Sequence, residues 1–125
     1  MLYNKTRRKE IIGRVKKADS FWQKFKGLMF KRKGNYNYAL IFDFGAEKRI
    51  EASIHMLFVF FPIDLVYLNK EKKVVELKHG IKPWSLNYTP KREARYLVEL
   101  PEGTIKKEKI GLKDELRWGQ ENEKK

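Results

Sequence analysis

The sequence predicts a mainly β (α+β) domain: a compact, largely antiparallel, barrel-like and strongly bent sheet with one short helix near residues 20–28. Two observations lead to this prediction. About six or seven short segments are rich in β-branched and aromatic residues, which pack well on a pleated sheet, and turn residues bound each of them. The longest apolar segment, residues 54–68, is hydrophobic at both odd and even positions, so protein should cover both of its faces. A bent or closed sheet provides that cover better than an open one.

The chain of 125 residues has the length of one domain, and we treat residues 1–125 as a single domain with flexible ends at 1–10 and 119–125. It contains no Cys and two His, which excludes disulfides, thiolate nucleophiles and Cys-based metal sites. We therefore expect no metal and no cofactor. The N-terminus leads into charged residues rather than an apolar signal segment, which predicts a cytoplasmic location. Heavy use of Lys, Glu and Arg is typical of hyperthermophile proteins.

The net charge of +13 is concentrated at the start of the chain, where residues 1–33 hold twelve basic and two acidic residues. Such a field attracts polyanions, but a solvated Lys-rich surface has the same composition. A nucleic-acid interface would need aromatic residues within a basic groove. No known nucleic-acid-binding signature accompanies the charge. The candidate polyanion contacts in this segment are Lys24, Lys26, Lys31, Arg32 and Lys33.

The first third of the chain contains the predicted helix. Residues 1–10 are polar and predict a mobile arm or an edge strand, followed by a short strand over residues 11–15. The helix near residues 20–28 is predicted by apolar side chains that recur at i, i+4 and i+7 and form a core-facing stripe: Phe21, Phe25 and Leu28. Residues 38–44 are the next predicted strand.

Pro62 divides the long apolar segment, because proline has no N–H to give to a central ladder. We predict strands over residues 54–61 and 63–69 that meet at a bend. A transmembrane span is rejected, because it needs about 20 apolar residues. This segment is shorter and is interrupted by His55, Pro62 and Asp64.

The second half of the chain alternates strands and turns. A hairpin loop over residues 69–72 leads to a strand at 74–77. Residues 79–90 contain two prolines and form the longest irregular segment, and long loops on a rigid scaffold often carry function. The remaining elements are a strand, a short helical turn and a brief terminal segment: residues 94–100, 105–110 and 115–118.

Four stretches, in this order and spacing, resemble the widespread family catalogued as domain of unknown function 192: residues 27–30, 62–68, 94–103 and 110–114. The resemblance covers roughly residues 14–118. It implies a compact, largely antiparallel, barrel-like β structure with a short helix, and no settled activity. Many bacterial relatives carry a polar Trp-Met-Lys-Asn-Thr segment before the proline. Residues 55–59 of this chain read His-Met-Leu-Phe-Val instead, so a polar pocket built from that segment would differ here.

His55 and Asp64 flank the bend at Pro62. A carboxylate beside an imidazole can fix its tautomer or make it a general base. The structural alternative is a hydrogen-bonded core histidine and an aspartate that accepts backbone N–H groups at the bend. No third member of a catalytic set is visible, so we assign no catalytic residue. Glu99 shares strand parity with Arg95, which indicates an ion pair or one wall of a site.

Three functional hypotheses follow. The leading one is a small, non-enzymatic, β-rich binding or accessory domain for an anionic or polar partner, with no membrane span. The alternatives are a non-specific nucleic-acid binder that uses residues 5–33 and an uncharacterised hydrolase that uses His55 and Asp64. The ligand-binding candidates are His55, Asp64, His79, Lys82, Trp84 and Tyr88.

Overall fold

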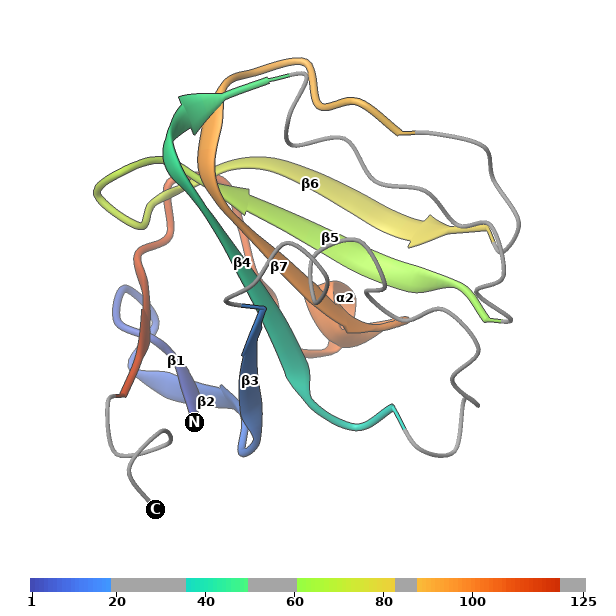
Figure 1. Cartoon of the computed structure of the whole chain (residues 1–125). Coiled ribbons are helices and arrows are strands. Elements are labelled where there is room, and N and C mark those ends of the chain that lie inside the picture. Colours follow the sequence, from blue (N-terminus) through green and yellow to red (C-terminus); the bar gives the residue numbers. More distant parts are fainter. Residues whose placement is uncertain (19–35, 50–60, 83–87, 120–125) are drawn as a thin grey trace.

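The computed structural model describes residues 1–18, 36–49, 61–82 and 88–119, and Figure 1 shows their arrangement. A three-stranded sheet has the order β2-β1-β8, and a five-stranded sheet has the order β3-β4-β7-β5-β6. The elements in chain order are β1 (Leu2–Asn4), β2 (Lys9–Ile12), β3 (Val15–Ala18), β4 (Ala39–Lys48), β5 (Ile63–Leu68), β6 (Val74–Ile81), β7 (Ala94–Pro101), α2 (Thr104–Lys107) and β8 (Leu116–Trp118).

Strand β7 is the centre of the larger sheet. It pairs antiparallel with β4 on one side and β5 on the other, so that Val98 lies opposite both Ile41 and Val66. Strand β3 pairs with β4 in parallel, which makes the sheet mixed. Long strands such as β4 and β7 curve as they cross the molecule (Figure 1). The predicted β-rich, largely antiparallel fold is confirmed.

Strand β5 separates two hydrophobic cores, and all six of its residues are buried. Ile63, Leu65 and Tyr67 enter the first core, which also contains aromatic residues from the segment before β4. Val66 and Leu68 enter the second core, which β1, β2, β8 and α2 cover from the other side. Because successive side chains of a strand alternate between faces, burial of every residue requires cover on both faces. The expectation drawn from the apolar segment is therefore confirmed for β5.

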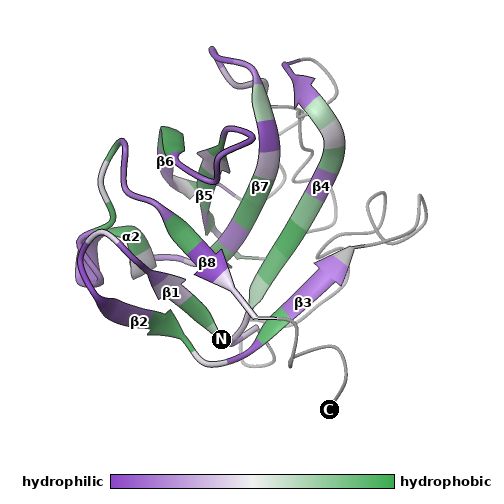
Figure 2. Cartoon of the chain, turned by 90° about the vertical axis from the view of Figure 1, so that its left-hand side faces the viewer, coloured by the Kyte–Doolittle hydropathy of each residue, from purple (hydrophilic) through white to green (hydrophobic). Residues whose placement is uncertain are grey.

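Two expectations need correction. Within the described residues the two sheets do not close into a barrel: β3 and β6 remain the edges of the larger sheet. Residues 1–10 are not a flexible arm, because β1 is the middle strand of the smaller sheet and Leu2 is completely buried. The hydropathy colouring in Figure 2 shows β1, β2 and β8 presenting both polar and apolar positions beside α2. A single apolar side chain in a polar segment was enough to place β1 in the second core.

The remaining predicted elements divide into three groups. The strands expected near residues 38–44, 63–69, 74–77 and 94–100 are present, and the helical turn expected near 105–110 is α2. The single strand expected over residues 11–15 is wrong, because β2 ends at Ile12 and β3 begins at Val15. The helix near residues 20–28 and the strand over 54–61 lie outside the described residues.

Candidate functional site

Asp64 lies at the beginning of β5 and is only 1% exposed. One carboxylate oxygen accepts the N–H of Gly80 at 2.8 Å, and the other accepts the N–H of Ile105 at 2.9 Å. These bonds tie β5 to β6 and to the first turn of α2. Both oxygens therefore accept hydrogen bonds from backbone N–H groups. This is the structural role considered for Asp64 from the sequence, and not the role of a partner for an imidazole.

The other described ligand-binding candidates, His79, Lys82 and Tyr88, lie on or near β6. His79 is exposed on β6, and Lys82 is exposed just beyond the end of that strand. The Tyr88 hydroxyl donates a hydrogen bond to Glu76 Oε2 at 2.5 Å, which connects the segment before β7 to β6. His55 and Trp84 lie outside the described residues, as do all five candidate polyanion contacts: Lys24, Lys26, Lys31, Arg32 and Lys33.

The expected ion pair between Glu99 and Arg95 does not form. Arg95 Nε donates to Asp43 Oδ1 on β4 at 2.6 Å instead. Four residues of strand span about 13 Å, which exceeds the reach of an arginine side chain. Arg95 lies near the solvent-exposed end of β7, whereas Glu99 is 5% exposed and lies deep in the strand. The alternation of side chains along the strand predicted the face of β7 on which Glu99 lies, but it did not show that Glu99 is buried while Arg95 lies near solvent.

Glu99 projects into the first core. On either side of it, Leu40 of β4 and Leu65 of β5 occupy the paired positions. No described residue donates a hydrogen bond to its carboxyl group. Burial raises the pKa of Glu99 from 4.5 to about 8. Most of the Glu99 population is therefore protonated at neutral pH.

Tyrosines surround this part of the core. Tyr36 and Tyr38 meet edge to face with ring centroids 5.1 Å apart, and Tyr36 stacks on Phe61 at 5.4 Å. The Tyr36 hydroxyl is buried, and no described residue hydrogen-bonds to it. Burial, with the nearby Glu99 as a further cause, raises the pKa of Tyr36, Tyr38 and Tyr67. The phenols stay neutral, which leaves Glu99 as the titrating group of this cluster.

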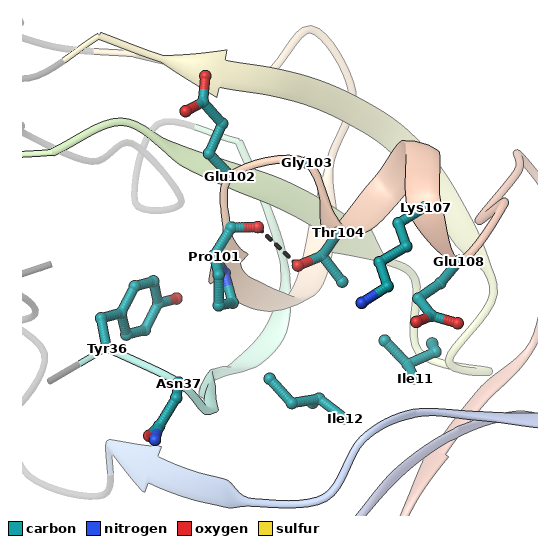
Figure 3. A pocket seen from close by; sticks show the side chains of 10 residues that line it. All are labelled: Ile11, Ile12, Tyr36, Asn37, Pro101, Glu102, Gly103, Thr104, Lys107 and Glu108. Atoms are coloured by element: carbon teal, nitrogen blue, oxygen red, sulfur yellow. Dashed lines mark hydrogen bonds between the residues drawn. The ribbon is translucent and has the colours of Figure 1, made fainter. Parts of the chain in front are cut away.

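A cleft of about 610 Å³ opens beside Tyr36, where β2, the segment before β4 and the residues after β7 meet (Figure 3). Its size is within the range of ligand pockets, about 300–1,000 Å³. Apolar groups of Ile11, Ile12 and Pro101 form much of its lining. Three separate segments build it, so no local sequence pattern could have revealed it.

The polar groups of the cleft are few. The Thr104 hydroxyl donates to the carbonyl oxygen of Pro101 at 2.6 Å, and Glu108 forms an ion pair with Lys9 at 3.4 Å. Lys107 has no anionic partner among the described residues. Figure 3 shows its side chain extending towards Thr104 and Ile11. The cleft thus combines apolar walls with the ammonium group of Lys107, which forms no ion pair with a described carboxylate.

The described residues also bear on metal binding and on membrane insertion. No three His, Cys, Asp or Glu side chains gather there as ligands for a metal ion. No helix in this part of the chain has the length and apolar character needed to cross a membrane.

Comparison with known proteins decides the family. The sequence model of DUF192, described as an uncharacterized ACR, matches residues 3–118. The chain is a member of the DUF192 family. A UPF0127 protein of Thermococcus sibiricus is 44% identical over 124 residues, which cover 99% of this chain and 78% of that protein. A UPF0127 protein of Pyrococcus furiosus is 44% identical over 117 residues, which cover 94% of this chain and 97% of the relative.

Solved structures agree with this DUF192 fold. A chain from Sinorhizobium meliloti, named only as a candidate transcription regulator, superposes with a TM-score of 0.76 at 22% identity, covering 93% of this chain and 88% of its own. A protein of unknown function from Novosphingobium aromaticivorans gives a TM-score of 0.75 at 18% identity, covering 83% of this chain and 74% of its own. At such identities the likeness shows the fold alone. The family resemblance expected from the sequence is confirmed, and the family has no established activity.

Proposed function

We propose that this DUF192 chain is a non-enzymatic binding domain that holds a small ligand, with an apolar body and an anionic group, in the cleft beside Tyr36. The observation that carries the proposal is the cleft of about 610 Å³ with the ammonium of Lys107, unpaired among the described residues, directed along it. Ligand sites are typically apolar concavities with a small number of polar groups that orient the ligand. We place this binding in the cytoplasm, the location expected from the sequence.

Each part of the ligand has a counterpart in the cleft. Ile11, Ile12 and Pro101 provide the apolar surface that favours burial of the ligand body. Lys107 can form a charge-assisted hydrogen bond with a carboxylate, sulfonate or phosphate group. The acidic Glu108 does not oppose this contact strongly, because Lys9 already neutralises it.

Binding is better supported than hydrolysis. Catalysis by the predicted pair would require Asp64 to orient or activate His55, and both oxygens of Asp64 already accept backbone N–H groups. The nucleic-acid alternative depends on residues 24–33, which lie outside the described residues, and it stays a prediction.

An amphiphilic anion tests the cleft directly. The probe is 1-anilinonaphthalene-8-sulfonate, whose fluorescence rises when its rings leave water, titrated at pH 7 into the parent and two variants. We expect Lys107→Gln to weaken binding by roughly two- to tenfold, corresponding to about 0.5–1.4 kcal/mol for a partly exposed ion pair. The matched control is Lys106→Gln, because Lys106 is exposed on the same helix but does not line the cleft.

A second substitution tests the apolar wall. Ile12→Glu places a carboxylate where the ligand body would lie, and we expect it to abolish the fluorescence change while circular dichroism remains that of the parent. Equal losses in the Lys107 and Lys106 variants would show general charge attraction and would contradict the proposal. Unchanged binding in Ile12→Glu would place the probe elsewhere.

A further inference from the structure

We propose that Glu99, together with Tyr36, Tyr38 and Tyr67, forms a second binding site, which takes the primary ammonium group of a small molecule. The inference does not depend on the function proposed for the cleft. It rests on Glu99, which is buried and receives no hydrogen bond from a described residue, and on the buried hydroxyl of Tyr36, which has no described hydrogen-bond partner.

Tyr36 and Glu99 are residues of equal exposure. The Glu99 side chain is 5% exposed, and no described group donates to it. Tyr36 is also 5% exposed, and its hydroxyl has no described partner. A buried polar group without a hydrogen bond is costly, and native proteins contain few of them. A buried carboxyl with no described donor and an unpartnered phenol hydroxyl, in one electrostatically coupled cluster, indicate a site that a ligand completes.

The chemistry of these groups selects the ligand. The Glu99 carboxylate and the Tyr36 hydroxyl oxygen accept hydrogen bonds, so the ligand must donate at least two, and it must be cationic to pair with Glu99. A primary ammonium has three donors and no acceptor. A single carboxylate among phenols offers too few oxygen ligands for calcium or magnesium. Tyrosine faces also attract cations, by about 0.5–2 kcal/mol each.

The cluster already shows this contact at one edge. Lys16 Nζ lies 4.4 Å from the centroid of the Tyr38 ring, and the Arg14 guanidinium lies 5.7 Å from the same centroid. The protein's own ammonium group thus uses a tyrosine of this cluster as a cation–π partner. A free amine would use the rings that lie nearer to Glu99.

Tyr36 connects the cluster to the surface. Its ring packs in the first core, yet the residue also lines the cleft. In Figure 3 its hydroxyl is directed towards Pro101, which ends the strand that carries Glu99. Glu99, Tyr38 and Tyr67 do not line the cleft, so an amine that enters from the cleft must pass Tyr36 to reach Glu99.

Ionisation of Glu99 couples binding to pH. Burial raises its pKa to about 8, so at neutral pH an ammonium ion must displace a proton from the carboxyl group. The described titratable groups that face Glu99 are Tyr36, Tyr38 and Tyr67, and burial raises the pKa of each phenol, so all three stay neutral. Asp64 belongs to the opposite face of β5, beside α2, but its charge also contributes to the raised pKa of Tyr36.

Calorimetry with n-propylammonium chloride tests the site. We expect binding with release of about one proton per ligand at pH 7, measured from the heats in two buffers of different ionisation enthalpy. Affinity should rise roughly eightfold from pH 6.5 to pH 7.5, because the ionised fraction of Glu99 rises by that factor. Tetramethylammonium has the same charge and no donor, so it should bind at least about tenfold more weakly.

Variants then assign the site. Glu99→Gln keeps the shape of the side chain and should remove both the binding and its pH dependence, while circular dichroism shows an intact fold. Tyr36→Phe should weaken binding by about three- to tenfold through loss of one hydrogen bond. The matched control is Glu93→Gln, which removes an exposed carboxylate just before β7 and should bind like the parent. Unchanged binding in Glu99→Gln, affinity that does not vary with pH, or equal binding of tetramethylammonium would each overturn the proposal.

Discussion

Replacement of Glu99 by Gln should change how the stability of the protein depends on pH. The folded-state pKa of about 8 lies well above the 4.5 expected when the chain unfolds. Because the native state favours the protonated carboxyl, this group's contribution to stability is fully present below pH 4.5 and is lost as the pH rises through 8. One pKa unit corresponds to about 1.36 kcal/mol. The parent should therefore lose about 3 kcal/mol between pH 4 and pH 7, and about 5 kcal/mol by pH 9, through Glu99 alone.

The glutamine variant cannot ionise at this position, so it should not show this loss. Burying the amide adds an offset that is the same at every pH, and the slope is therefore the diagnostic quantity. The assay is denaturant unfolding of both proteins at pH 4, 7 and 9, with linear extrapolation to water. We expect the free energy of unfolding of Glu99→Gln, relative to the parent, to rise by about 3 kcal/mol from pH 4 to pH 7. Parallel pH profiles for the two proteins would refute the reasoning, and Glu93→Gln should follow the parent.

Two further predictions concern the carboxylates that organise the second core and the smaller sheet. Asp64→Ala should lower the free energy of unfolding by about 3 kcal/mol, because the buried N–H groups of Gly80 and Ile105 lose their acceptor, and denaturant unfolding at pH 7 measures it. A loss below about 1 kcal/mol would mean that water replaces the carboxylate. Burial opposes ionisation of Asp114, but hydrogen bonds from Asn4, Arg7 and Gly111 outweigh it and lower the pKa. The contribution of ionised Asp114 to stability is present above the unfolded pKa of 3.8 and is lost as the pH falls through the folded value. Asp114→Ala should therefore flatten the acid side of the profile of melting temperature against pH. An unchanged acid side would show that other groups cause the acid sensitivity.

The strands were predictable where burial acts on both faces. The segment that became β5 is apolar at odd and even positions, and the structure places a hydrophobic core on each side of it. β1 was not predictable, because three residues are too few to show a period, and Leu2 alone supplies the apolar contact of that strand with the second core. Strand parity likewise gave the face of Glu99 but could not show that Asp43, on a neighbouring strand, pairs with Arg95.

The candidate site was less predictable than the fold for a related reason. The cleft joins side chains from β2, from the segment before β4 and from the residues after β7, and their proximity depends on the packing of the two sheets. Tyr36 carried no local signal at all, since an aromatic residue before a strand is ordinary core composition. Asp64 did carry a signal, because an aspartate beside a proline bend often accepts backbone N–H groups, and its observed partners agree with that interpretation.

The pH dependence of stability and the proposed amine binding depend on the same group, the Glu99 carboxyl. A buried carboxyl without a partner lowers the stability of the folded state at neutral pH, and a neutral glutamine would remove that loss. Stability alone therefore gives no reason for an acid at this position. A ligand that binds the charged carboxylate does give a reason. Strained or destabilising groups in proteins are often found at functional sites. An ammonium ligand should raise the free energy of unfolding most at pH 8 to 9, where Glu99 is ionised, and least below pH 5. If Glu99→Gln is more stable at pH 7 yet no longer responds to the amine, the same carboxyl group is both the destabilising element and the binding group.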